Sequence, residues 1–221
     1  MHRLQDLYER LLAHFGPQHW WPGDGMVEIV VGAVLTQNTN WRNVEKAIAN
    51  LKNDALLSLT ALAGLPHAEL AERIRPSGYY NLKAQRLKNL VHFLVDQVAE
   101  YGSLTSFFAQ DLSVLRLQLL SVKGIGPETA DSILLYAAEK QIFVVDAYSY
   151  RFLSRHGLVA SESSYEEMQE LFMDALPADA ALYNEYHALL VCLGKEFCRK
   201  RNPRCRECPL QDDLPTDCWS E

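Results

Sequence analysis

The 221-residue chain contains 48% hydrophobic and 22% charged residues, which excludes an intrinsically disordered protein and fits one large domain or two small interlocked ones. Its most apolar run, residues 27–35, contains Glu28 and is shorter than the ~20 residues of a membrane span, so we expect no membrane partner. The net charge of −7 weighs against nucleic-acid binding but is compatible with a local basic patch. Because the first residues have the features of neither a signal peptide nor a transit peptide, we expect a cytoplasmic protein.

Helical periodicity extends along nearly the whole chain. Apolar residues at i, i+3 and i+4 spacing predict a first helix over residues 4–15. A loop with two adjacent tryptophans follows, and then a buried helix over residues 26–36 that Asp24 could cap. Further helical patterns lie at residues 43–52, 68–74, 83–99, 104–109, 112–121, 127–138, 148–156, 165–176 and 181–193. The strand-like run 142–145 is too short to form a sheet, so the sequence predicts an all-α fold.

Residues 121–130, Ser-Val-Lys-Gly-Ile-Gly-Pro-Glu-Thr-Ala, join two predicted helices. Gly124 and Gly126 permit a tight hairpin, and Pro127 suits the first turn of a helix because its missing N–H costs nothing there. Backbone N–H groups at a helix start form an anion site. This segment, with Lys123, is therefore a candidate to bind a DNA phosphate, and an ordinary helix-to-helix turn is the alternative.

Asp146 ends the apolar run 142–145 and begins a predicted helix. The simple interpretation is an N-cap, whose carboxylate accepts backbone N–H bonds and has a lowered pKa as a result. A fixed, ionised carboxylate is also what a reaction through an oxocarbenium-like sugar requires, either to stabilise the sugar or to activate water. Asp146 is therefore a candidate catalytic residue.

All five cysteines lie in the last 30 residues, which is typical of a metal site rather than a disulfide scaffold. Cys198, Cys205, Cys208 and Cys218 are separated by six, two and nine residues and could hold an iron–sulfur cluster or a zinc ion. Cys192 lies in an apolar run and is expected in the core.

Residues 195–206 hold six basic residues and one acidic residue. A metal would make this loop rigid, and a rigid loop loses less entropy when it binds a DNA backbone. The candidate contacts are Arg199, Lys200, Arg201 and Arg204. A solvated charge run explains the composition equally well.

A hairpin, an aspartate 20 residues after it and a C-terminal four-cysteine loop together resemble the helix–hairpin–helix DNA glycosylases of the endonuclease III superfamily. The resemblance covers nearly the whole chain. It implies a two-lobed all-α fold, with DNA and active site in the cleft between the lobes, and an enzyme that flips a damaged nucleotide and cuts its N-glycosidic bond. It also implies a nucleoid-associated monomer acting on double-stranded DNA.

The same resemblance implies a division of the chain. A six-helix, barrel-like lobe with the hairpin is expected at residues 22–133. The second lobe is expected to combine residues 1–21 with residues 134–221, and to carry a [4Fe-4S] cluster in the loop 195–218. Zinc in place of iron–sulfur is the alternative.

Individual roles follow from matched positions. Asp146 matches the family's catalytic aspartate, while Gln37 and Tyr79 match residues that fill the gap or wedge the duplex after flipping. Bifunctional members carry a nucleophilic lysine where this chain has Glu128. Without that amine no Schiff base forms, so we expect a monofunctional enzyme with weak or absent lyase activity. Glu128 could position water, or simply favour the helix start.

Several segments are most similar to the bacterial 3-methyladenine DNA glycosylase III type, among them residues 20–22, 35–39 and 145–150. This similarity implies that Trp20 and Trp41 sandwich the base and that Trp21 and Pro22 complete the pocket wall. A methylated purine is a flat cation that aromatic faces attract. Alternatives are core tryptophans, a substrate such as an oxidised pyrimidine or mismatched thymine, and a catalytically weak DNA-binding or structure-sensing homologue.

Overall fold

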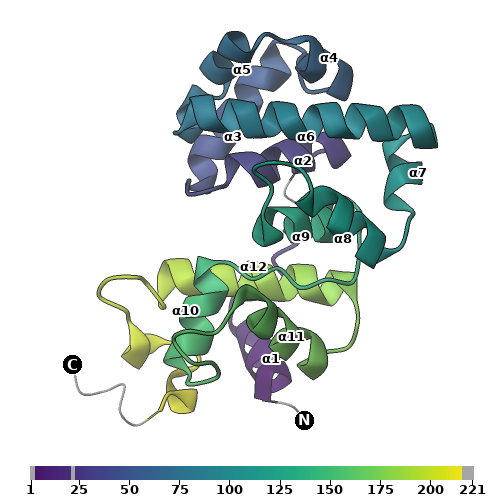
Figure 1. Cartoon of the computed structure of the whole chain (residues 1–221). Coiled ribbons are helices and arrows are strands. Elements are labelled where there is room, and N and C mark those ends of the chain that lie inside the picture. The colour runs from purple at the N-terminus through teal and green to yellow at the C-terminus, as the bar shows by residue number, and fades with distance from the viewer. Residues whose placement is uncertain (1–2, 21–22, 216–221) are drawn as a thin grey trace. The chain divides into compact units, whose positions relative to one another are not determined.

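The computed structural model describes residues 3–20 and 23–215, and the elements within those ranges are helical (Figure 1). The α-helices are α1 (Arg3–Phe15), α2 (Met26–Leu35), α3 (Trp41–Asn53), α4 (Leu59–Gly64), α5 (His67–Arg73), α6 (Tyr80–Tyr101), α7 (Leu104–Phe108), α8 (Leu112–Leu120), α9 (Pro127–Tyr136), α10 (Ala147–Arg155), α11 (Tyr165–Ala175) and α12 (Ala180–Glu196). Three 3-10 turns are η1 (Arg75–Ser77), η2 (Cys205–Glu207) and η3 (Gln211–Asp213). The described ranges contain no strand, which confirms the predicted all-α fold. None of the described helices is long and apolar enough to cross a membrane.

The structure differs from the sequence analysis in two local features, one helix that was not predicted and one predicted cap that is absent. The helix α4 gave no sequence signal because it is six residues long and buries only Leu62, although Ser58 caps it by accepting from Ala61 N–H. Asp24 does not cap α2: Gly25 occupies the N-cap, and the Asp24 carboxylate accepts from Lys52 Nζ at 2.8 Å instead. A cap requires only local geometry, but a cation from another helix competes for the same carboxylate.

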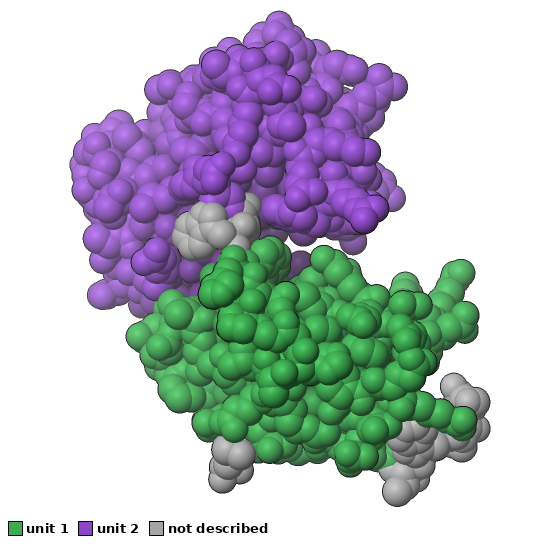
Figure 2. All heavy atoms as spheres, turned by 180° about the vertical axis from the view of Figure 1, so that it is seen from behind, with its two compact units in different colours: residues 1–20, 141–221 green, residues 21–140 purple. Residues whose placement is uncertain are grey.

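The chain forms two compact units, which Figure 2 shows in different colours. Unit 1 contains residues 1–20 and 141–221, and unit 2 contains residues 21–140. The lobe boundaries expected from the sequence stay a prediction.

The organising element of unit 2 is α6, which is 22 residues long. It packs against α2, α4, α5 and α7, and α2 in turn contacts α3 and α9. The apolar face of α6 is fully buried and includes Leu87, Leu90, Val91 and Leu94. One long helix therefore packs against four of the other helices of this unit and holds α2 between itself and α3 and α9 through direct contacts.

The core of unit 1 is aromatic. Phe143 stacks on Phe172 with ring centroids 3.9 Å apart, and Tyr186 meets both rings edge-on. The Tyr186 hydroxyl donates to the carbonyl of Leu4 at 2.9 Å, which ties α12 to α1. Gln169 Nε2 donates to the carbonyl of Phe143 at 2.6 Å. The run 142–145 is therefore a buried connection that fixes where Asp146 emerges.

The two helices of the hairpin, α8 and α9, are joined by a buried ion pair. Arg116 Nε donates to Asp131 Oδ1 at 2.8 Å, and Arg116 Nη2 donates to Oδ2 at 3.2 Å. The Asp131 side chain is completely buried, whereas that of Arg116 is 24% exposed. The pair costs desolvation energy, so its main consequence is that neither partner can be removed alone.

Arg116→Met should therefore lower the free energy of unfolding by about 3–5 kcal/mol, because the buried Asp131 carboxylate loses its cation. Urea denaturation followed by circular dichroism measures this change. Arg42 is exposed on α3, and Arg42→Met is the matched control, with an expected change within about 0.5 kcal/mol. Equal effects of the two substitutions would contradict a locking role for the pair.

Candidate functional site

The carboxylate of Asp146 begins α10. Its Oδ1 accepts from the N–H groups of Tyr148 and Ser149, both at 2.8 Å, and from Ser149 Oγ at 3.0 Å. Ser149 Oγ also approaches the Asp146 N–H at 3.4 Å, which completes a capping box. The predicted N-cap is present, and its hydrogen bonds are made by Oδ1.

The second oxygen of Asp146 faces a histidine that the sequence analysis did not single out. His187 Nε2 lies 3.5 Å from Asp146 Oδ2, and both side chains are largely buried, 7% and 14% exposed. Burial tends to raise the pKa of Asp146, but His187 and the hydrogen bonds from Ser149 together hold it below its ordinary value. Asp146 is therefore ionised at neutral pH. The one feature of the sequence that could have indicated His187 is that it is a polar residue at the start of the apolar run 187–193.

Trp20 packs against His187, the residue that faces Asp146. Its ring centroid lies 5.4 Å from that of His187, with the planes tilted by 36°. Trp20 is half-buried. The structure thus brings one predicted pocket tryptophan next to the predicted catalytic carboxylate, with His187 between them. Trp21 and Pro22, the other predicted wall residues, lie outside the described residues.

A glycine lets the helices that carry this group approach each other. A Cβ on Gly194 of α12 would collide with the ring of Tyr148 on α10. The same ring lies under the Arg151 guanidinium, 5.1 Å from its carbon, and Arg151 Nε donates to the carbonyl of Cys198 at 2.6 Å. The crossing places the first turn of α10, and with it Asp146, beside His187 of α12.

The predicted hairpin is present in unit 2. Gly124 has a φ of 97°, a conformation that favours glycine, and the Ile125 N–H donates to the Val122 carbonyl at 3.0 Å. Gly126 is the N-cap of α9, and Pro127 occupies its first turn. Lys123 and Glu128 are both exposed at this end of α9.

Gln37 and Tyr79 lie in the same unit as the hairpin. Gln37 Nε2 donates to Thr129 Oγ1 at 2.9 Å and to the Gly124 carbonyl at 3.3 Å, so its amide touches the hairpin directly. Tyr79 precedes α6 with a left-handed φ of 45°, and its side chain is 73% exposed. The sequence located both residues but gave no indication of these contacts.

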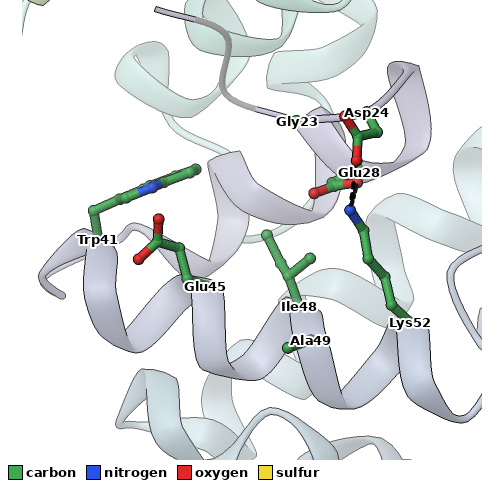
Figure 3. Close-up of a pocket in the computed structure, with 8 residues that line it drawn as sticks. All are labelled: Gly23, Asp24, Glu28, Trp41, Glu45, Ile48, Ala49 and Lys52. Carbon is green, nitrogen blue, oxygen red and sulfur yellow. Dashed lines mark hydrogen bonds and ion pairs between the residues drawn. The ribbon is translucent and has the colours of Figure 1, made fainter.

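A pocket of about 400 Å³ in unit 2 has Trp41 at one end (Figure 3). Its lining consists of Gly23, Asp24, Glu28, Trp41, Glu45, Ile48, Ala49 and Lys52. Lys52 Nζ lies 2.8 Å from Asp24 and 2.7 Å from Glu28, and this ion-pair group lies away from Trp41. Trp41 belongs to unit 2 and Trp20 to unit 1, so their sandwich stays a prediction.

Three of the four predicted metal ligands line one small pocket. Cys198, Cys205 and Cys208 share it with Arg155, His156, Leu193, Phe197 and Leu214. Burial raises the pKa of Cys208 to about 11, and the neighbouring thiols of Cys198 and Cys205 add to the effect. All three are free thiols. Their convergence in a largely apolar pocket suits soft sulfur ligation.

No metal site is formed by the described residues themselves, among which no three His, Cys, Asp or Glu side chains have a metal-holding arrangement. The fourth predicted ligand, Cys218, lies outside the described residues. Cys192 does not line the thiol pocket: it is half-buried, and its Sγ donates to Gln18 Oε1 at 3.1 Å.

The basic loop between the first two of these cysteines is mostly open to solvent. Arg199, Lys200 and Arg201 are exposed. Arg204 differs, because it forms an ion pair with Glu207 and lies over the Phe197 ring at 5.5 Å. Three of the four predicted DNA contacts are therefore accessible cations. The fourth, Arg204, would have to break its ion pair with Glu207 or keep it while contacting DNA.

Residues 31–178 match the model of the HhH-GPD superfamily of base excision DNA repair proteins. A provisionally named DNA repair glycosylase, MJ1434 of Methanocaldococcus jannaschii, is 47% identical over 95% of this chain and 94% of its own length. The Helicobacter pylori 3-methyladenine DNA glycosylase MagIII, solved with 1,N6-ethenoadenine, is 32% identical, with a TM-score of 0.75 over 86% of this chain and 96% of its own. Endonuclease III, solved with DNA, shares the fold at a TM-score of 0.80 and 20% identity, over 96% of this chain and 94% of its own.

The lowered pKa of Asp146 predicts how stability depends on pH. In the unfolded chain the carboxyl titrates near its ordinary value of about 3.9, and in the folded protein it titrates lower. Its contribution to stability is therefore fully present above that value and is lost as pH falls through the folded pKa. Asparagine also caps helices, so Asp146→Asn isolates the effect of the charge.

The test compares the free energy of unfolding of the wild type and of Asp146→Asn by urea denaturation between about pH 2.5 and 7. The difference should be constant above about pH 5 and shrink below about pH 4. A difference that grows towards acid pH would mean that burial raises the pKa of this carboxyl.

Proposed function

Since the chain belongs to the HhH-GPD superfamily of base excision DNA repair proteins, we propose that it is a monofunctional DNA glycosylase that removes an alkylated purine, such as 3-methyladenine, from duplex DNA. The broader activity, that of a DNA glycosylase, follows from the family. The observation that carries the glycosylase chemistry is the ionised Asp146 carboxylate, held at Oδ1 and placed beside His187 and Trp20, while the choice of an alkylated purine rests on the 32% identity to MagIII.

Asp146 supplies the chemistry in this proposal. As the N-glycosidic bond breaks, positive charge develops on the sugar, and a fixed carboxylate stabilises that charge or orients the attacking water. A base methylated at a ring nitrogen is cationic and leaves without protonation, so the site needs no strong general acid. His187, at 3.5 Å from Oδ2, would hold the carboxylate in its reactive orientation.

The pocket residues match a flat cation. Indole faces attract cations, and the Trp41 pocket adds the carboxylate of Glu45 to that attraction, whereas Glu28 in the same lining is paired with Lys52. In the proposed complex Trp20 and Trp41 sandwich the base, and Trp21 and Pro22 complete the wall. The 32% identity to a 3-methyladenine glycosylase whose structure contains a purine adduct supports the alkylated-purine class.

The absence of a lysine at position 128 supports the monofunctional assignment. A lyase of the usual kind needs an amine that forms a Schiff base with the sugar, and Glu128 cannot form one. Glu128 is exposed in the first turn of α9, where the helix dipole favours an acid and where it could help to position water.

DNA binding is assigned to two groups of residues. In unit 2, the hairpin segment with Lys123, Gly124 and Gly126 would hold a phosphate, while Gln37 and Tyr79 enter the duplex at the lesion. In unit 1, the basic loop with Arg199, Lys200, Arg201 and Arg204 would contact the backbone. We expect the protein to act on the nucleoid as a monomer.

The cofactor that we propose is a [4Fe-4S] cluster bound by Cys198, Cys205, Cys208 and Cys218. When bound, the cluster would hold the basic loop rigid, because its ligands lie on both sides of that loop. Three of these thiols already share one pocket.

Base release from methylated duplex DNA tests the proposal. The wild type should release 3-methyladenine and leave strand breaks only after alkali treatment. Asp146→Asn should retain DNA affinity and lose base release by at least about 100-fold, since the charge at the reacting sugar is gone. Chromatography of released bases and gel electrophoresis of the DNA measure both effects.

Other results would redirect the assignment. Release of an oxidised pyrimidine or of mismatched thymine, without 3-methyladenine, would replace the alkylated-purine class. DNA binding without release of any base would identify a structure-sensing homologue. Undiminished release by Asp146→Asn would remove this residue from the mechanism.

The cluster proposal has its own test. Cys205→Ala should lose iron, acid-labile sulfide and visible absorption, because it removes a ligand from the shared pocket. Cys192→Ala is the matched control and should keep all three, since Cys192 lies outside that pocket. Elemental analysis and absorption spectroscopy suffice, and a colourless wild type containing zinc would overturn the iron–sulfur assignment.

A further inference from the structure

Helix α6 carries polar side chains at intervals of three residues, and together they contact three loops of unit 2: the loop with Gln37, the turn before Tyr79 and the hairpin. Lys83, Arg86 and Asn89 lie along one stripe of the helix, since residues three apart are neighbours on its surface. We call these three residues the α6 stripe. The sequence analysis did not single out any of them.

The first member joins two loops. Lys83 is 1% exposed, and its Nζ donates to the carbonyls of Leu35 and Ser77, at 2.8 and 2.7 Å, and to Thr39 Oγ1 at 2.8 Å. Leu35 ends α2 and Thr39 lies in the loop that contains Gln37, whereas Ser77 lies in the turn before Tyr79. One ammonium therefore fixes the distance between the loops of Gln37 and Tyr79.

These partners explain why the buried lysine is tolerated. Burial, with a smaller contribution from Arg86, lowers the pKa of Lys83 to about 8. The ammonium at pH 7 is thus held by three neutral oxygens, one of which belongs to the negative end of the α2 dipole. Such an arrangement is costly and specifies one geometry of the two loops.

The second member joins Gln37 to the hairpin. Arg86 Nη1 donates to Gln37 Oε1, and Gln37 Nε2 donates to Thr129 Oγ1 and the Gly124 carbonyl. The Arg86 guanidinium therefore decides which end of the Gln37 amide faces the hairpin. The stem of Arg86 fills the space beside Gly124, where a Cβ would lie 2.5 Å from Arg86 Cγ.

The third member secures the hairpin loop itself. Asn89 Nδ2 donates to the carbonyl of Lys123 at 2.9 Å. The hairpin is thus attached to α6 at residues 123 and 124, next to its anion-binding end.

We infer that the α6 stripe sets the spacing of the three DNA-contacting loops, and that Arg86 is the positioning residue that couples Gln37 to the hairpin. The inference rests on the proposed function for its biological meaning, because that function assigns the three loops to DNA. Its structural claim, that Arg86 and the hairpin hold the Gln37 amide in one orientation, does not depend on any substrate.

Three variants separate this role from simple stabilisation. Arg86→Met keeps a stem beside Gly124 and removes the guanidinium. Gln37→Ala removes the positioned amide, and the double variant combines them. Lys88→Met is the matched control, because Lys88 lies on the same helix but its Nζ donates to the carbonyls of Leu62, Ala63 and Leu65.

The readouts are the single-turnover rate of base release and the affinity for undamaged duplex DNA. Arg86→Met and Gln37→Ala should each slow base release about 10- to 100-fold, with less than a threefold change in affinity for undamaged DNA. The double variant should be no slower than the worse single variant, because both remove the same amide position. Arg86→Lys, which retains the charge, should recover part of the rate, and Lys88→Met should release base at the wild-type rate.

A substrate-free measurement separates this inference from the proposed function. In the wild type the side-chain NH₂ resonances of Gln37 should be shifted and slow to exchange, and Arg86→Met should move them to solvent-exposed values. Unchanged resonances, or rate effects of the two substitutions that multiply, would overturn the coupling. Absence of base release by the wild type would overturn the proposed function, and the Gln37 resonances would still decide the coupling.

Discussion

The carboxylate of Asp146 is the group on which the candidate site depends, and it is ionised inside the protein because His187 lies against one of its oxygens and the first turn of α10 binds the other. Burial opposes this state, so several contacts must act together to maintain it. The aromatic core around Phe143 fixes the chain just before Asp146, and Gly194 lets α10 approach the helix that carries His187. Removing the whole side chain would remove the helix cap and the proposed catalytic carboxylate together, whereas Asp146→Asn removes the charge and keeps a residue that caps helices.

The candidate site residues are divided between the units. Unit 1 contains the carboxylate, Trp20 and the thiol pocket, while unit 2 contains the hairpin, Gln37, Tyr79 and the Trp41 pocket. Each unit has a largely buried charge beside its candidate residues: Asp146 in unit 1, and Lys83 and the Asp131 pair in unit 2. Buried charges tolerate few alternative arrangements, so both sets are held in one defined geometry.

The sequence predicted those features whose causes are local. The hairpin glycines, the Asp146 cap and most helices follow from residues within a few positions of one another. The features it missed depend on distant partners: His187 lies 41 positions from Asp146, and Arg86 lies 49 positions from Gln37. Asp24 fails as a cap for the same reason, since Lys52 competes for its carboxylate. A pattern of residue types contains no information on which of these pairs will meet.

The backbone of Tyr79 has a consequence for the speed of a search along DNA. Its left-handed conformation makes Tyr79 the N-cap of α6, so the exposed ring stands directly at the start of a 22-residue helix and not in the middle of a long loop. In the proposed role, the protein would not have to order a loop between its first contact with the DNA and the test of a base pair by the Tyr79 ring. The dwell time at each site would then be set by how readily the DNA itself deforms, and weakened pairs would be detected first.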